Sequence, residues 1–102
     1  MNWVRLAATS EVEVGQVKGF VIGHKKIALY HTVDGFYATS DLCSHSGRLL
    51  SAGSLNQHTV MCPAHGGKFN VKSGRATAFP CVEPVKPYPL DIRGHEVWIK
   101  LY

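Results

Sequence analysis

The sequence lacks any long hydrophobic run. Its uncharged apolar stretches, such as Ile27 to Tyr30, are far shorter than the roughly 20 residues that cross a bilayer as a helix. The segment from Met1 to Val14 also lacks the apolar core that a secretory signal peptide carries. We therefore expect a cytoplasmic protein that does not enter a membrane.

Charged residues are scarce and scattered. They make up 18% of the 102 residues, and eleven Lys and Arg against seven Asp and Glu leave a net charge of +4. Because no contiguous basic run is present, nucleic acid is not an expected partner. No carboxylate pair, Ser-His-Asp combination or phosphate-binding loop stands out, so we do not expect an enzyme. With 45% hydrophobic residues, the chain predicts one globular domain over residues 1–102.

No window of the sequence keeps the 3.6-residue apolar period of a helix, so we predict an all-β fold. Asp34-Gly35 and Arg93-Gly94 are predicted as hairpin turns. Residues 42–84 are rich in Ser, Gly, His and Pro and predict a loop-built insert on a base that is an antiparallel β sandwich or barrel. The strands of the base are predicted at Trp3–Leu6, Val17–Ile22, Lys26–Val33, Phe36–Ala38, Tyr88–Ile92 and Glu96–Leu101.

The chain has three cysteines, an odd number that does not suit a disulfide framework. Two of them stand beside histidines in the insert, as Cys43-Ser44-His45 and Cys62-Pro63-Ala64-His65. In a reducing compartment, a cysteine with a histidine beside it more often binds metal than forms a disulfide. The paired short spacings therefore predict one metal site clamped by two loops.

A structural zinc ion is one interpretation of two Cys and two His ligands. Zinc motifs, however, usually pair Cys with Cys and His with His, whereas here each loop supplies one of each. That arrangement favours a two-iron cluster, and zinc stays the alternative.

The two loops resemble the ligand boxes of Rieske proteins. The resemblance continues through Phe69-Asn70, Ser73-Gly74-Arg75-Ala76, the loop around Pro80 and Pro87-Tyr88-Pro89-Leu90, and it is strongest to the Rieske ferredoxins of bacterial aromatic ring-hydroxylating dioxygenases. It implies one [2Fe-2S] cluster, with one iron held by the two cysteines and the other by the two histidines. The expected ligands are Cys43, His45, Cys62 and His65.

The same resemblance implies a one-electron carrier, which we expect to be a monomer. Its expected partners are a flavin-dependent ferredoxin reductase, which supplies the electron, and a terminal Rieske oxygenase, which receives it. The alternative is a Rieske-type small subunit of an assimilatory nitrite reductase. If the basic excess guides docking, the partner surfaces should be acidic and electron transfer should slow as salt is added.

Residues near the ligands indicate a low reduction potential. High-potential Rieske proteins carry an extra Cys in each box, where this chain has Arg48 and Ala64, and a Ser and a Tyr hydroxyl near the cluster, where it has Gly67 and Phe69. Each missing hydroxyl removes a hydrogen bond that would stabilise the reduced state, so we predict a midpoint of about −150 mV. The third cysteine, Cys81, is predicted as a packed loop thiol.

The remaining histidines have no cysteine neighbour, and we expect ordinary surface or pairing roles for them. They are His24, His31, His58 and His95.

Overall fold

The computed structural model describes residues 3–44, 47–63 and 66–101. Within these ranges the regular structure consists of short strands and two single-turn 3-10 helices, and every strand pairing is antiparallel. The predicted all-β fold is confirmed. The elements are β1 (Trp3–Ala8), η1 (Thr9–Glu11), β2 (Val17–Ile22), β3 (Lys25–Thr32), β4 (Gly35–Ser40), η2 (Leu50–Ala52), β5 (Ser54–Asn56), β6 (Thr59–Met61), β7 (Lys68–Asn70), β8 (Ala76–Ala78), β9 (Pro87–Tyr88), β10 (Leu90–Arg93) and β11 (Glu96–Lys100).

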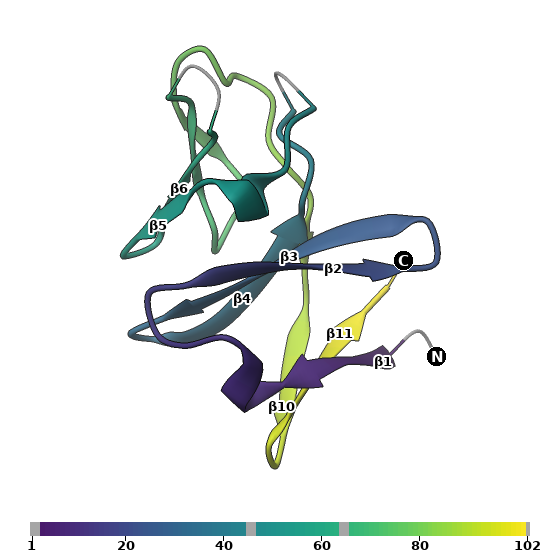
Figure 1. The fold of residues 1–102 in the computed structure, drawn as a ribbon. Coiled ribbons are helices and arrows are strands. Elements are labelled where there is room, and N and C mark those ends of the chain that lie inside the picture. Colours follow the sequence, from purple (N-terminus) through teal and green to yellow (C-terminus); the bar gives the residue numbers. More distant parts are fainter. Residues whose placement is uncertain (1–2, 45–46, 64–65, 102) are drawn as a thin grey trace.

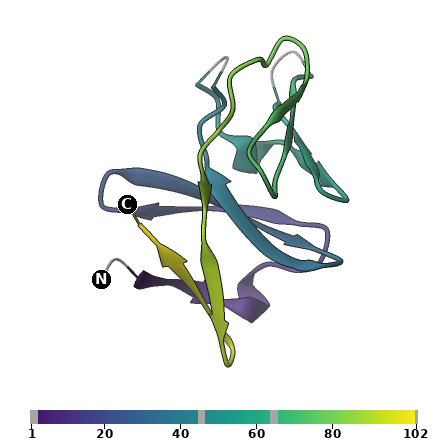
Figure 2. The same ribbon diagram turned by 180° about the vertical axis from the view of Figure 1, so that it is seen from behind.

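The strands form three sheets, with the orders β1-β11-β10, β2-β3-β4-β9 and β5-β6-β7-β8. Figure 1 shows the first two sheets in the lower part of the molecule and the third above them, and Figure 2 shows the same arrangement from behind. The first two sheets are the base that the sequence predicted. The third sheet is built from the insert of residues 42–84.

Strand β3 has a hydrophobic core on each of its faces. Ile27 and Leu29 point into the core between the two base sheets, whereas Ala28 and Tyr30 point into the core under the third sheet. All four side chains are completely buried. Because successive residues of a strand face opposite sides, a strand covered on both sides needs a continuous apolar run, which explains the sequence from Ile27 to Tyr30.

The first predicted hairpin turn lies one residue earlier than expected, and the second lies one residue later. Thr32 pairs with Gly35, so the central residues of the first turn are Val33 and Asp34. The Thr32 hydroxyl accepts a hydrogen bond from the Asp34 amide at 3.1 Å and donates one to the Gly35 carbonyl at 3.0 Å. This side-chain closure, which the Asp-Gly pattern does not encode, sets the register.

The second turn has Gly94 and His95 at its centre, since Arg93 pairs with Glu96 across it. The φ of Gly94 is 62°, a conformation that side chains with a Cβ rarely adopt. The prediction of Arg93-Gly94 as the central pair was therefore wrong by one position.

The predicted strand Tyr88–Ile92 is two strands. β9 pairs with β4 in the second sheet, and β10 pairs with β11 in the first. Pro89 lies between them, and its missing N–H cannot support a continuous ladder, so the chain changes sheets at this residue.

The insert is more regular than a set of loops. Short strands were expected near Val60 and Phe69, and these are β6 and β7, but β5 and β8 were not predicted. Strands of three residues are too short to show a period in the sequence. No helix in the described part of the chain is long and apolar enough to cross a membrane.

Candidate metal centre

The first predicted ligand, Cys43, lies in a tight loop that follows β4. Its amide donates to the carbonyl of Arg48 at 2.8 Å, and its carbonyl accepts from the amide of Gly47 at 2.9 Å. A bridge between Leu42 and Leu49 closes the loop at its base. The Cys43 side chain is almost completely buried.

A buried carboxylate anchors this loop to η2. Asp41 accepts hydrogen bonds from the amide of Ser51 at 2.7 Å and from its hydroxyl at 2.6 Å, and its own carbonyl accepts from the amide of Leu50 at 2.7 Å. Asp41 is only 2% exposed, so these bonds replace those that water would otherwise make. The chain on both sides of Cys43 is thereby fixed. The sequence reasoning did not identify Asp41, because its partner lies ten residues away and matches no local motif.

The second predicted ligand, Cys62, lies in the loop between β6 and β7. Its amide donates to the carbonyl of Gly67 at 2.7 Å, immediately beyond the pair formed by Met61 and Lys68. The Cys62 side chain is 1% exposed and belongs to the same hydrophobic cluster as Cys43.

The two loops have the same backbone design. In each, the cysteine amide donates to the carbonyl five residues later, Arg48 in the first loop and Gly67 in the second. In each, the residue four positions after the cysteine is a glycine with a positive φ, 71° at Gly47 and 73° at Gly66. Two matching turns that each place one cysteine sulfur in a shared buried core are well suited to hold one cofactor from two sides.

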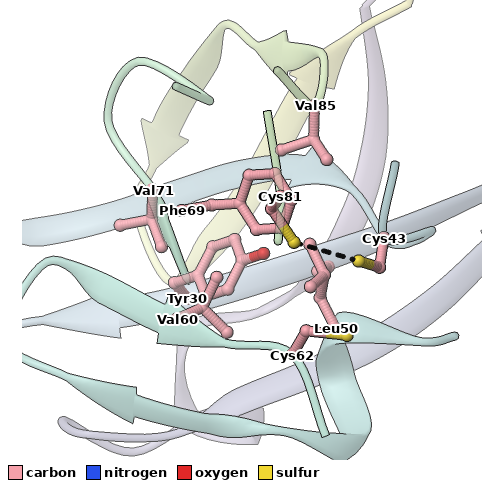
Figure 3. Packing of buried hydrophobic residues seen from close by; sticks show 10 residues of the cluster. Tyr30, Cys43, Leu50, Val60, Cys62, Phe69, Val71, Cys81 and Val85 are labelled. Carbon is pink, nitrogen blue, oxygen red and sulfur yellow. Dashed lines mark hydrogen bonds between the residues drawn. The ribbon is translucent and has the colours of Figure 1, made fainter. Parts of the chain in front are cut away.

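A third loop, between β8 and β9, lies over this pair and contains Cys81. Ser44 donates a hydrogen bond from its hydroxyl to the Glu83 carbonyl at 2.6 Å and so ties the first loop to the third. The sulfur of Cys81 lies 3.6 Å from that of Cys43 (Figure 3). The sequence placed Cys81 as a packed thiol, and it is 4% exposed. Its contact with Cys43 was not predicted, because 38 residues separate the two.

Burial and the neighbouring thiols together raise the pKa of Cys81 to about 12. Loss of water around the thiol is the largest cause, followed by its contact with Cys43 and by the charge on Cys43 and Cys62. Cys81 therefore keeps its proton at neutral pH.

The buried tyrosine of this core, Tyr30, donates its proton to a threonine. The hydroxyl groups of Tyr30 and Thr39 lie 2.8 Å apart, and Thr39 donates its own proton to the Ser40 carbonyl at 2.9 Å. Tyr30 must therefore donate to Thr39. Burial raises the pKa of Tyr30, which keeps the hydroxyl protonated and committed to this bond.

The other two predicted ligands, His45 and His65, lie outside the described residues. The described residues that flank them are Ser44 and Gly47 in the first loop, and Pro63 and Gly66 in the second. Among the described residues, no group of three or more His, Cys, Asp or Glu side chains could hold a metal ion.

Two of the histidines that were not expected to be ligands make other contacts. His31 stacks on Phe36 with ring centroids 3.9 Å apart, and its Nδ1 lies 2.7 Å from the carbonyl oxygen of Val12. His58 places its Nε2 2.7 Å from a carboxylate oxygen of Asp34, which joins the base to the third sheet.

The described donors fit an iron-sulfur cluster. Cluster irons take thiolate ligands from buried cysteines, and Cys43 and Cys62 offer two such sulfurs in apolar surroundings. Burying a thiolate without a cation costs free energy. A bound metal ion offsets this cost at Cys43 and Cys62.

The family model for the Rieske [2Fe-2S] domain matches residues 2–89. The ferredoxin component of the naphthalene 1,2-dioxygenase system of Pseudomonas aeruginosa is 37% identical over 100 residues, which cover 98% of this chain and 96% of that protein. This chain therefore belongs to the Rieske [2Fe-2S] family and carries one [2Fe-2S] cluster, which overturns the zinc alternative. Its homologues are electron-carrying ferredoxin components, and like them it is not an enzyme.

Solved structures agree with this assignment. The ferredoxin of carbazole 1,9a-dioxygenase from Nocardioides aromaticivorans is 31% identical, with a TM-score of 0.95 and full coverage of both chains. A complex of reduced oxygenase and oxidized ferredoxin in carbazole 1,9a-dioxygenase matches 97% of this chain and 93% of that one, at 33% identity and a TM-score of 0.90. A putative nitrite reductase small subunit matches at 20% identity, which shows the fold alone.

Proposed function

We propose that this protein carries single electrons from a flavin-dependent ferredoxin reductase to the terminal Rieske oxygenase of an aromatic ring-hydroxylating dioxygenase system in the cytoplasm. Cys43 and Cys62 hold one iron of the cluster, and His45 and His65 hold the other. The pair of matching loops that bury the two cysteine sulfurs is the observation that carries the proposal. The full-length similarity to ferredoxin components of dioxygenase systems supports the choice of partners.

When bound by the ligands of both loops, a [2Fe-2S] cluster would supply one-electron redox chemistry, and the residues of the chain would set its potential. Two neutral imidazoles in place of two thiolates make the cluster less negative than one with four cysteines, which favours reduction. The described residues contribute burial of the two sulfurs, a rigid backbone in both loops and the exclusion of water from the cysteine side.

Apolar side chains are exposed around the cysteines. Leu42 precedes Cys43 and is 42% exposed, Phe79 lies two residues before Cys81 and is 84% exposed, and Val82 follows Cys81 and is 71% exposed. Figure 1 shows these loops at the end of the molecule opposite the β10–β11 turn. The loops that carry these side chains meet where the sulfurs of Cys43 and Cys81 lie 3.6 Å apart, and exposed apolar side chains can form an interaction surface. Leu42, Phe79 and Val82 form what we name the loop-end surface.

We assign the loop-end surface to the terminal oxygenase. Electron transfer requires the donor and acceptor centres to approach closely, and the residues of this surface lie next to Cys43 in the chain or within two residues of Cys81, which contacts Cys43. A redox complex must also dissociate quickly, which suits a small apolar patch rather than an extensive interface. The related complex of oxygenase and ferredoxin supports an oxygenase as the occupant.

A single-turnover assay tests the proposed function. The chain, with its cluster reduced by a flavoprotein reductase of a naphthalene dioxygenase system, is mixed without oxygen with the oxidised oxygenase of that system. We expect oxidation of the chain with matching reduction of the oxygenase, followed by stopped-flow absorbance, and a rate that falls as salt is added. Stable association with a flavin- and siroheme-containing subunit, without transfer to the oxygenase, would instead favour the nitrite reductase alternative.

The reduction potential is a separate prediction. Phe69 is completely buried and has no hydroxyl, Gly67 has no side chain, and the Tyr30 proton is committed to Thr39. With these hydroxyl donors absent, the midpoint should lie near the lower end of the Rieske range, at about −150 mV. A redox titration followed by circular dichroism measures it, and a midpoint above zero would contradict the prediction.

A further inference from the structure

Cys81 occupies a position that its role as a packed thiol does not explain. Its sulfur lies 3.6 Å from the sulfur of Cys43, a distance at which one thiol can donate a hydrogen bond to the other sulfur. Both residues are buried, at 4% and 2% exposure, so water does not compete for this contact. Figure 3 shows the two sulfurs pointing toward one another from different loops.

The second ligand loop makes room for this thiol. A Cβ atom placed on Gly67 would overlap the sulfur of Cys81, so only glycine at this position lets the sulfur lie where it does. The Cys81 amide also donates to the Ala78 carbonyl at 3.2 Å, which fixes the backbone of the third loop. The Cys81 sulfur is thus confined between one ligand loop and the backbone of the other.

The direction of the bond follows from the chemistry of the ligand. Cys43 binds iron as a thiolate and then has no proton to donate. Only Cys81 can supply the proton between the two sulfurs. A hydrogen bond to a ligand sulfur becomes stronger when the cluster gains an electron, because the sulfur then carries more negative charge.

We propose that Cys81 is a positioning residue that donates an S–H···S hydrogen bond to the Cys43 thiolate and thereby raises the reduction potential of the cluster. This inference rests on the proposed function, in which Cys43 is a ligand. It adds a tuning residue from the third loop to the ligands of the first two.

Substitution of Cys81 tests the proposal in the cluster-loaded protein. Cys81→Ala removes the donor and should lower the equilibrium constant for reduction about threefold to tenfold, where tenfold corresponds to about 59 mV for one electron. Cys81→Ser keeps a donor and should have a midpoint closer to that of the wild type than Cys81→Ala has. Val85→Ala is the matched control, because Val85 is equally buried in the same core and has no polar atom. It should lose stability without a change in midpoint.

Infrared spectroscopy gives a second measurement that needs no variant. With Cys43 and Cys62 as ligands, Cys81 is the only one of the three cysteines that retains an S–H group. Its stretching band should move to lower frequency when the cluster is reduced. An S–H band that does not respond to reduction would overturn the proposal, as would equal midpoints for Cys81→Ala and the wild type.

Failure of this inference is distinguishable from failure of the proposed function. A normal Rieske EPR signal together with equal midpoints for Cys81→Ala and the wild type would reject only the proposed hydrogen bond. Retention of that signal in Cys43→Ser would reject the ligand assignment on which the proposed function depends.

Discussion

Cys62→Ser is expected to yield a colourless protein without the EPR signal of a reduced Rieske cluster. Cys62 is one of two buried cysteines on matching loops, and the other thiol of this core, Cys81, already contacts Cys43. The loops also lose the cofactor that joins them. If loss of the cofactor lowers the free energy of unfolding by about 2 kcal/mol, the melting temperature should fall by about 8–16 °C. For a domain of this size, 1 kcal/mol of unfolding free energy corresponds to about 4–8 °C in melting temperature.

Visible absorption, iron content and thermal unfolding measure these effects. Met61→Ser is the matched control, because Met61 precedes Cys62 but is exposed, and it should keep both colour and stability. Full iron content with an unchanged EPR spectrum in Cys62→Ser would remove Cys62 from the ligand set.

Phe79→Asp is expected to lower the second-order rate of electron transfer to the oxygenase by about 10- to 100-fold. Phe79 is the most exposed large hydrophobic side chain in the described part of the chain, and it lies on the loop-end surface. Loss of an aromatic anchor at an interface costs about 2 kcal/mol or more, and each 1.4 kcal/mol is a factor of ten. A carboxylate in an apolar contact adds the cost of its desolvation.

The measurement is the second-order rate in the single-turnover assay, with the midpoint of each variant determined alongside it. Val33→Asp is the matched control, because Val33 is 77% exposed in the β3–β4 turn and is not part of the loop-end surface. Equal rates for the two variants would show that the oxygenase docks elsewhere. A shifted midpoint in Phe79→Asp would mean that the substitution acts on the cluster rather than on docking.

The sequence predicted the features that depend on neighbouring residues. The alternation around Val97 and Ile99 located β11, and the boundaries of β2 were predicted correctly. The short spacings around Cys43 and Cys62 indicated two tight loops, and the described parts of these loops contain matching turns at the two cysteines. Each of these signals lies within a few residues of chain.

Features that depend on distant residues were not predicted. Cys81 reaches Cys43 only because the third loop folds over the first, and Asp41 is buried only because η2 returns to it. Pro89 could be recognised as an interruption, but the change of sheet that occurs there depends on where β4 and β11 lie. The predicted registers of the hairpin turns were wrong for a related reason, because the hydrogen bonds of the Thr32 hydroxyl set the register of the β3–β4 turn.

The two faces of β3 limit how the metal-binding part of this protein can be engineered. A graft of residues 42–84 onto another scaffold would omit Ala28 and Tyr30, which belong to the same core as Cys43, Cys62 and Cys81. The grafted sulfurs would then face solvent or a foreign surface on that side. The smallest transplantable unit therefore includes β3, and because the other face of β3 needs the base sheets to cover Ile27 and Leu29, a transplant of the centre requires nearly the whole chain.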